Sequence, residues 1–138
     1  PGVTKAGTVC HRPVDYMNIY PTLVDLCGLP TPVNPNGQKL SGVSQRALLA
    51  DVNAAWDRPA LTTHGRNNHA LRSQDFRYIQ YADGTEELYD HRNDPMEFTN
   101  QANNPDFAQV KQAMAQWLPK TNVPEAPRDR NLGKRGKK

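Results

Sequence analysis

Residues 64–90 constrain the fold more than any other part of the chain, because strand-like segments follow one another there with only tight turns between them. Three short segments alternate in part between apolar and polar side chains: residues 68–72, 77–81 and 86–89. Asp83-Gly84 separates the second from the third, and glycine accepts the positive φ that a tight hairpin turn requires. We therefore expect an antiparallel meander, to which residues 60–64 add a fourth strand.

Amphipathic helices are predicted before and after these strands. Apolar side chains recur at steps of three and four along residues 14–27, where Pro21 is expected to start a new turn or to kink the helix. A second helix ends at Leu118, and Asn104 is its predicted cap because the following proline suits the first helical position. The apolar side chains expected to cover the sheet are Phe107, Val110, Met114, Trp117 and Leu118.

Smaller elements complete the prediction. We expect a short strand at residues 8–10, a short helix at 44–50 capped by Ser44, and one helical turn within 93–100. Trp56 is expected to pack on the core. A chain of 138 residues with 12 prolines is long enough for one domain with a modest core and many loops. The predicted fold class is therefore α+β, with a four-stranded antiparallel sheet packed against a C-terminal helix.

The positive charge of the chain is concentrated at its end. The formal net charge is +3, whereas residues 128–138 alone carry six basic side chains and one acidic side chain. The rest of the chain is therefore slightly acidic and does not predict a basic surface that would bind nucleic acid. We expect residues 119–138 to form a disordered basic tail without packed structure, since proline, asparagine and charge dominate there.

The two cysteines and the hydropathy pattern exclude few classes of protein. Cys10 and Cys27 have neither metal-binding spacing nor a Cys-x-x-Cys arrangement, and they leave open one disulfide or two buried thiols. No apolar run approaches the eighteen residues that a membrane span requires. The chain starts at Pro1 without a methionine or signal peptide, which predicts that it is a piece of a longer protein.

The densest group of polar side chains is the candidate binding site, which comprises His64, Arg66, Asn67 and His69. A loop between strands with such donors suits an anionic oxygen, as in a carboxylate or a sulfate. The alternative is ordinary turn chemistry beside a satisfied strand histidine. A metal site built from the two histidines is disfavoured, since no third ligand has suitable spacing.

A second polar group follows the last predicted strand and contains Asp90, His91, Asp94 and Glu97. Such carboxylates could bind calcium or transfer protons, but Asp94-Pro95 is typical of a turn and Glu97 can serve a local amide or an arginine. The structural interpretation is favoured. No phosphate-binding glycine loop, nucleophile elbow or zinc motif occurs in the chain.

Three segments resemble the C-terminal part of type I sulfatases, in the alkaline phosphatase superfamily. Residues 14–30 (VDYMNIYPTLVDLCGLP) resemble the family's VDLYPTLLDLAGLP helix, and residues 40–49 (LSGVSQRALL) resemble the segment that follows it. Residues 77–100 (RYIQYADGTEELYDHRNDPMEFTN) are similar to the family pattern RYI-x-Y…ELYDL-x-x-DP-x-E-x-x-N. The order and spacing agree over residues 1–118, and the subfamily with the nearest pattern is that of bacterial iduronate-2-sulfatase-like enzymes.

The resemblance implies a division of the chain. In the family a large α/β domain is followed by a smaller domain in which a four-stranded antiparallel sheet packs against a terminal helix. Residues 1–30 would then be the last loop and helix of the missing catalytic domain, and residues 31–118 the C-terminal subdomain. Without the large domain, Val14, Met17 and Leu23 are expected to be left unburied.

The resemblance also implies that catalytic residues are absent from this chain. Family members need a cysteine or serine in a Cys-x-Pro/Ala-x-Arg motif, converted to formylglycine, and Asp and Asn ligands for calcium. Neither Cys10 nor Cys27 lies in such a motif. Calcium and formylglycine are therefore expected in the full-length enzyme and not in this fragment, which would be inactive alone.

The function implied is hydrolysis of sulfate esters, with sulfated carbohydrate as the expected substrate. The four residues of the candidate site would then form part of the substrate-pocket wall. Alternatives are a non-catalytic module that binds anionic glycan or nucleic acid through its basic tail, and a fragment of a related phosphoesterase. The expected partner is the missing N-terminal catalytic domain, and export to the periplasm or the cell exterior is expected by resemblance.

Overall fold

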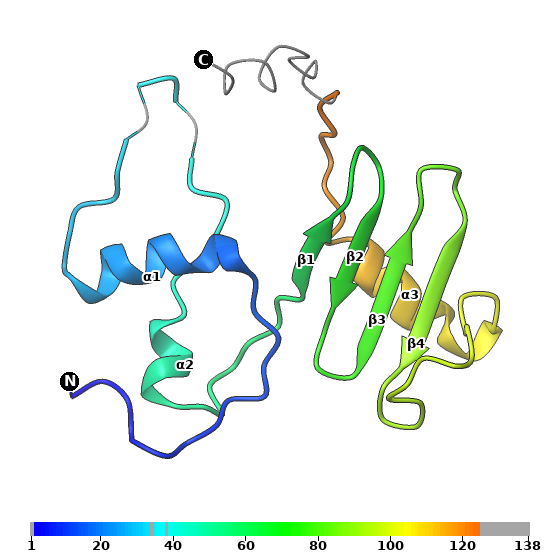
Figure 1. Cartoon of the computed structure of the whole chain (residues 1–138), viewed down its shortest axis with the longest axis horizontal. Helices are drawn as coiled ribbons and strands as arrows, with labels where there is room; N and C mark the ends of the chain where they lie inside the picture. Colours follow the sequence, from blue (N-terminus) through cyan, green and yellow to red (C-terminus); the bar gives the residue numbers. More distant parts are fainter. Residues whose placement is uncertain (1, 34, 38, 125–138) are drawn as a thin grey trace, which may run out of the picture.

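The computed structural model describes residues 2–33, 35–37 and 39–124, and these form two parts joined side by side. The elements in chain order are η1 (Tyr16–Asn18), α1 (Ile19–Leu26), α2 (Arg46–Ala50), β1 (Ala60–Thr63), β2 (His69–Arg72), β3 (Phe76–Gln80), β4 (Glu86–Asp90), η2 (Pro105–Phe107) and α3 (Ala108–Ala115). Figure 1 shows α1 and α2 on one side and the sheet on the other, with α3 behind the strands. The predicted α+β class is confirmed.

The sheet is an antiparallel meander with the strand order β1-β2-β3-β4. Each strand pairs with the next strand in the chain, as the tight turns predict, and the boundaries differ from the predicted ones by about one residue. One row across all four strands is apolar and consists of Leu61, Leu71, Tyr78 and Leu88. Because side chains alternate between the two faces of a strand, this row defines the face that packs against α3.

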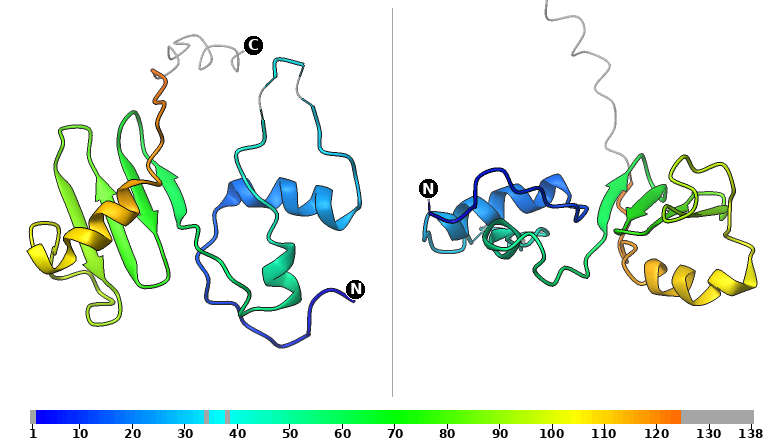
Figure 2. Two further views of the ribbon diagram at one scale, coloured as in Figure 1. Left: turned by 180° about the vertical axis from the view of Figure 1, so that it is seen from behind. Right: turned by 90° about the horizontal axis from the view of Figure 1, so that it is seen from below.

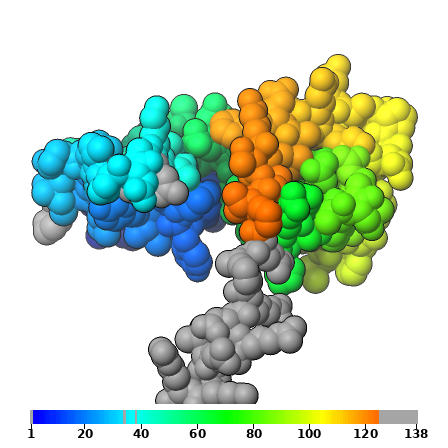
Figure 3. Space-filling view, turned by 90° about the horizontal axis from the view of Figure 1, so that it is seen from above, coloured from blue at the N-terminus to red at the C-terminus, as the bar shows by residue number. Residues whose placement is uncertain are grey.

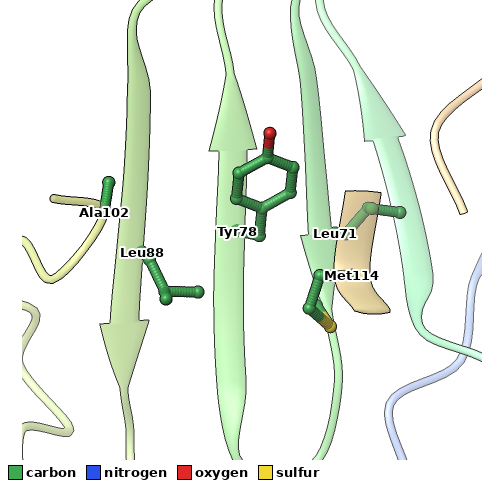
Figure 4. Packing of buried hydrophobic residues seen from close by; sticks show 5 residues of the cluster. All are labelled: Leu71, Tyr78, Leu88, Ala102 and Met114. Carbon is green, nitrogen blue, oxygen red and sulfur yellow. The ribbon is translucent and has the colours of Figure 1, made fainter. Parts of the chain in front are cut away.

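The core lies between this row and α3. Leu71, Tyr78 and Leu88 are almost completely buried, and Met114 of α3 covers them together with Ala102 (Figure 4). Four of the five predicted helix residues contact this core, namely Phe107, Val110, Met114 and Leu118. The fifth, Trp117, is 37% exposed and stacks with the guanidinium group of Arg58, which lies 5.1 Å from the ring centroid.

The start of the last helical segment agrees with the cap prediction. The Asn104 side chain accepts a hydrogen bond from the amide of Asp106 at 3.0 Å, and Pro105 occupies the first helical position of η2. The amide that proline lacks would have no helical partner there, so proline costs nothing at this position. Regular helix ends at Ala115, and turns continue to Leu118.

Polar side chains of η1 and α1 hold the segment that precedes α2. Asn18 Oδ1 accepts the amide of Val43 at 3.0 Å, and Thr22 Oγ1 accepts the amide of Gln45 at 2.9 Å. Pro21 lies in the first turn of α1, where its missing amide breaks no helical bond. The apolar periodicity of α1 gave no indication of these buried polar contacts.

The apolar face of the first helical region is mostly exposed in this chain. Val24 is buried, whereas the exposed set comprises Val14, Met17, Ile19, Tyr20, Leu23 and Leu26. The prediction that Val14, Met17 and Leu23 are left unburied is confirmed. An exposed apolar patch of this kind is typical of an interaction surface.

Several local predictions were wrong. Residues 8–10 form no strand, because the chain turns at Thr8, whose amide and hydroxyl both bond the carbonyl of Lys5. Residues 93–100 contain no helical turn, since Glu97 has a φ of 61° and the Asp94 carboxylate accepts the amide of Thr99. Trp56 was expected to pack on the core, but it is half-buried and donates its indole N–H to the Pro13 carbonyl at 3.2 Å.

The remaining corrections concern the short helix and the cysteines. α2 begins at Arg46, and the Ser44 hydroxyl accepts the amide of Arg46 at 3.1 Å while it donates to Asp25 at 2.6 Å. Cys10 and Cys27 are free and exposed, so they form neither a disulfide nor a pair of buried thiols. Neither cysteine is part of the buried core.

Candidate functional site

The loop that joins β1 to β2 carries three of the four predicted site residues. The amide of His64 donates to the carbonyl of Asn68 at 3.0 Å and closes the loop. Within it, Gly65 and Asn67 have φ values of 69° and 63°, a left-handed conformation that glycine and asparagine adopt at the least cost. The loop therefore presents the exposed side chains of His64, Arg66 and Asn67 to solvent.

Asn68, the second asparagine between the two histidines, fixes the position of this loop. Its Nδ2 donates to the Arg66 carbonyl at 3.2 Å, and its Oδ1 accepts the amide of Ala82 at 3.0 Å. Ala82 belongs to the turn between β3 and β4, which lies at the same end of the sheet (Figure 1). One amide side chain thus links the two loops, a tertiary contact for which the sequence contains no local signal.

His69 lies apart from the other three residues. It is only 4% exposed, because its side chain lies on the α3 side of the sheet, as does that of Leu71 two residues later. Its Nδ1 lies 2.9 Å from Thr63 Oγ1, and its Nε2 lies 2.7 Å from Asn122 Oδ1. Since an amide oxygen only accepts, Nε2 donates to Asn122, and Nδ1 shares the second hydrogen bond with the threonine hydroxyl.

The contact with Asn122 also changes the description of the segment that follows α3. Figure 3 shows this orange segment at the junction of the two parts, beside the green strands. Pro119 and Asn122 are half-buried, and Asn122 gives the buried His69 a partner for its second nitrogen, whereas Lys120 and Thr121 are exposed. Residues 125–138 of the predicted tail lie outside the described residues.

We expect His69→Ala and Asn122→Ala each to lower the free energy of unfolding by about 1–2 kcal/mol, since each leaves a buried polar partner unsatisfied. The double variant should lose less than the sum of the two, because both substitutions remove one shared hydrogen bond. Urea unfolding of the four proteins measures this. Asn103→Ala, at an exposed position, is the control and should change the unfolding midpoint little; additive losses would show that the two side chains are not coupled.

A hollow of about 250 Å³ lies on the open face of the sheet, beside the β1–β2 loop. Its floor is a second cross-strand row, formed by Thr62, Ala70 and Ile79. The other lining residues are His64, Asn68, His69 and Tyr81. The hollow therefore connects predicted site residue His64 with residues of three strands that the sequence did not bring together.

The polar group after β4 is held by local partners. Glu97 Oε1 accepts from Arg77 Nε at 3.1 Å and lies 2.6 Å from His91 Nε2. Asp90 accepts from Nε and Nη2 of Arg92, each at 2.8 Å. Within the described ranges no three or more His, Cys, Asp or Glu side chains are grouped so that they could bind a metal ion.

The pairing of Asp90 predicts a dependence of stability on pH. Hydrogen bonds from the Arg92 side chain hold the pKa of Asp90 at about 2, below its ordinary value of 3.8. Because the pKa is lowered in the folded state, the stabilisation is complete above about pH 4 and is lost as the pH falls through 2. We expect the free energy of unfolding to fall by no more than about 2 kcal/mol over this pH range. Between pH 5 and pH 2 the melting temperature of Asp90→Asn should fall less than that of the wild type. Equal falls for the two proteins would contradict the prediction.

Comparison with known proteins places this geometry in a family. The family model described as "N-sulphoglucosamine sulphohydrolase, C-terminal" matches residues 1–123. The chain belongs to this sulfatase C-terminal family. The predicted resemblance to type I sulfatases is thereby confirmed, and the match extends through the three segments that carried it.

Relatives of known name agree with this assignment. A protein named "Sulfatase" from Formosa agariphila is 43% identical over 117 residues, which cover 85% of this chain and 22% of that protein. A "Delta 4,5-hexuronate-2-O-sulfatase" from Bacteroides thetaiotaomicron is 31% identical and is aligned over 72% of this chain and 23% of its own length. The chain spans about a fifth of the length of these relatives.

Solved structures of related proteins contain the same fold. The phosphonate monoester hydrolase of Agrobacterium radiobacter matches with a TM-score of 0.53 and 26% identity, over 80% of this chain and 28% of that one. The match supports the wider superfamily as well as the antiparallel sheet with its helix. No helix within the described parts of the chain has the length and apolar character needed to cross a bilayer.

Proposed function

We propose that the protein containing this chain is a sulfuric ester hydrolase that acts on sulfated carbohydrate, and that this chain is its C-terminal region. The match of the sulfatase C-terminal family over residues 1–123 is the observation that carries the proposal. The hexuronate-2-O-sulfatase among the relatives supports a sulfated sugar as the substrate class. In this protein, the chain would shape the substrate pocket and would not cleave the ester.

The nucleophile and its cofactors belong to the part of the protein outside this chain. Neither Cys10 nor Cys27 has the flanking residues for conversion to formylglycine. The group of carboxylates that most resembles a calcium site comprises Asp90, Asp94 and Glu97. These carboxylates accept hydrogen bonds from local side chains and amides. The residues present thus do not fit calcium or formylglycine, so no catalytic step is assigned to this chain.

The exposed face of α1 is the proposed contact with the catalytic domain. Ile19, Tyr20 and Leu23 are each about half exposed, although they belong to a helix whose Val24 is buried. Since this chain aligns with less than a quarter of the length of these relatives, the preceding domain is the proposed cover of this face. We also propose that the protein containing this chain is exported, and an N-terminal signal sequence on that protein would support this proposal.

The β1–β2 loop is the proposed wall of the substrate pocket. His64, Arg66 and Asn67 present donors that suit a sulfate or a carboxylate, and Asn68 fixes the loop that carries them. His69 contributes to the site as a positioning residue, because its two ring nitrogens are already hydrogen-bonded within the chain. The double variant His64→Ala/Arg66→Ala should raise KM for a sulfated disaccharide about tenfold or more.

The test of the function uses the full-length protein. Peptide mapping should find a cysteine or serine converted to formylglycine upstream of residue 1, and the protein should release sulfate from a 2-O-sulfated heparin disaccharide. An unmodified threonine or serine nucleophile with activity on phosphonate or phosphate esters would favour the phosphoesterase alternative, which the likeness to phosphonate monoester hydrolase keeps open. A binding module would release neither sulfate nor phosphate, and its glycan affinity would be lost with residues 128–138.

A further inference from the structure

The two faces of the sheet differ in what covers them. Helix α3 packs on one face, and the views from behind and below in Figure 2 show it on that side alone. The opposite face contains the cross-strand row of Thr62, Ala70 and Ile79. Two of these three side chains, those of threonine and alanine, are short and rise little above the sheet. A depression therefore forms over β1 and β2, next to the taller side chains of β3 and β4.

Tyr81 stands at the edge of this depression in a fixed position. Its amide donates to the carbonyl of Thr85 at 2.9 Å, and its carbonyl accepts the amide of Gly84 at 3.0 Å. Burial, with a further contribution from the neighbouring Glu87, raises the pKa of its phenol, so the hydroxyl stays protonated. Glu87 also accepts from the Tyr89 hydroxyl at 3.0 Å, so this carboxylate lies between the two tyrosines.

The lining has the two kinds of surface that one sugar ring presents. A pyranose has apolar C–H groups on its faces and hydroxyl groups around its rim. Ile79, Ala70 and the ring of Tyr81 supply the apolar part, whereas His64 and Asn68 supply polar groups at the margin. None of the described residues that line the hollow is a carboxylate, and the exposed Arg66 lies in the loop beside it. Arg66 favours an anionic sugar, while Glu87, the neighbour of Ile79 on β4, is occupied by the two tyrosines.

The size of the hollow sets how much it can hold. Pockets that enclose drug-sized ligands measure roughly 300–1,000 Å³. The hollow of about 250 Å³ is smaller and is open to solvent along the sheet. It therefore suits one ring of a longer glycan.

We propose that this hollow is a saccharide subsite, in which Tyr81 stacks against one ring of an anionic glycan while His64 and Asn68 bind hydroxyl groups of that ring. The subsite rests on the proposed sulfatase function. It adds to that function a second ring, next to the sulfated one, as a determinant of substrate choice. Of the pocket wall proposed above, Arg66 and Asn67 bind the sulfated group, whereas His64 lies at the border with the subsite and contacts the second ring.

The experiment compares two substrates in the full-length enzyme. The first is a 2-O-sulfated heparin disaccharide, and the second is 4-nitrocatechol sulfate, which has no sugar. Tyr81→Ala should lower the ratio of kcat/KM for the disaccharide to that for the aryl sulfate about tenfold, mainly through KM, since an aromatic contact contributes at this level. Tyr81→Phe should keep the ratio within about twofold, because stacking does not need the hydroxyl.

A second variant tests the hollow with Tyr81 in place. Ala70→Val adds bulk to the floor and should also raise KM for the disaccharide, and valine suits a strand. The matched controls are Ala60→Val, on the same face of β1 outside the hollow, and Tyr89→Ala, beside the same Glu87. Both controls should leave the substrate ratio unchanged, and melting temperatures of all variants report any loss of folding.

Distinct outcomes separate the two proposals. Wild-type enzyme that releases sulfate from neither substrate overturns the sulfatase function and the subsite with it. Wild-type enzyme that cleaves the disaccharide, together with an unchanged ratio in both Tyr81→Ala and Ala70→Val, overturns the subsite alone. An equal loss on both substrates in these variants also overturns it, since that result assigns the open face to packing against the rest of the protein.

Discussion

Gly42→Ala should destabilise the protein by about 3 kcal/mol or more. A Cβ atom on Gly42 would overlap the carbonyl of Met17 at the start of the first helical region and would lie 2.9 Å from the backbone nitrogen of Asn18. These atoms are backbone, so no side-chain rotation can relieve the overlap. The segment would have to move away from the helix, and the bond from the Val43 amide to Asn18 would be lost.

Gly28→Ala is the matched control for this substitution. Gly28 has a φ of 62°, but a Cβ atom there would meet nothing within 4 Å. Its expected cost of about 1 kcal/mol comes from the left-handed backbone alone. Urea or thermal unfolding of the two variants in the same full-length protein measures the difference, and equal losses would show that the close approach at Gly42 is not a structural requirement.

Tyr78→Ala should cost about 4 kcal/mol, because it removes the largest fully buried side chain of the core. The Tyr78 ring lies between Leu71 and Leu88 in the cross-strand row, and its hydroxyl donates to Glu86. Tyr78→Phe should cost only about 1 kcal/mol, since it keeps the ring and removes one hydrogen bond, while Glu86 keeps its ion pair with Lys111 at 2.9 Å.

Tyr89→Ala is the comparison for the core variant. Tyr89 belongs to the adjacent strand but faces the side of the sheet without α3, so its loss should cost clearly less than that of Tyr78. The free energies of unfolding from urea titration test the order Tyr78→Ala, then Tyr89→Ala, then Tyr78→Phe. A loss for Tyr89→Ala as large as that for Tyr78→Ala would mean that the open face is as well packed as the core.

Much of the fold could be predicted because its signals are local. The Asp83-Gly84 turn sets one hairpin, and the alternation along the strands gives the register in which Leu71, Tyr78 and Leu88 share a face. The cap at Asn104 was equally local, since the asparagine and the amide it accepts are two residues apart. These elements depend on neighbours within a few positions, and the chain itself encodes them.

The candidate site was only partly predictable. The polar residues between β1 and β2 identified the loop. However, the short spacing of His64 and His69 suggested that both belong to one cluster, whereas in the structure their side chains lie on opposite sides of the sheet. Strand alternation would have separated them, because His69 has the parity of the buried Leu71. Tyr81 had no motif to mark it, and only the pairing of the strands brings it to one hollow with His64 and Asn68.

The meander, the capped helix that covers it and the resemblance to sulfatases could all be inferred from the order of residues, because each depends on residues adjacent in the chain or on motifs in order. The contacts between distant segments became visible in the folded molecule alone: His69 with Asn122, Gly42 against Met17, and Tyr81 and Ala70 in one hollow. Such contacts depend on how the chain closes in space, since burial and the need to satisfy buried polar groups are properties of the packed molecule and not of any single stretch.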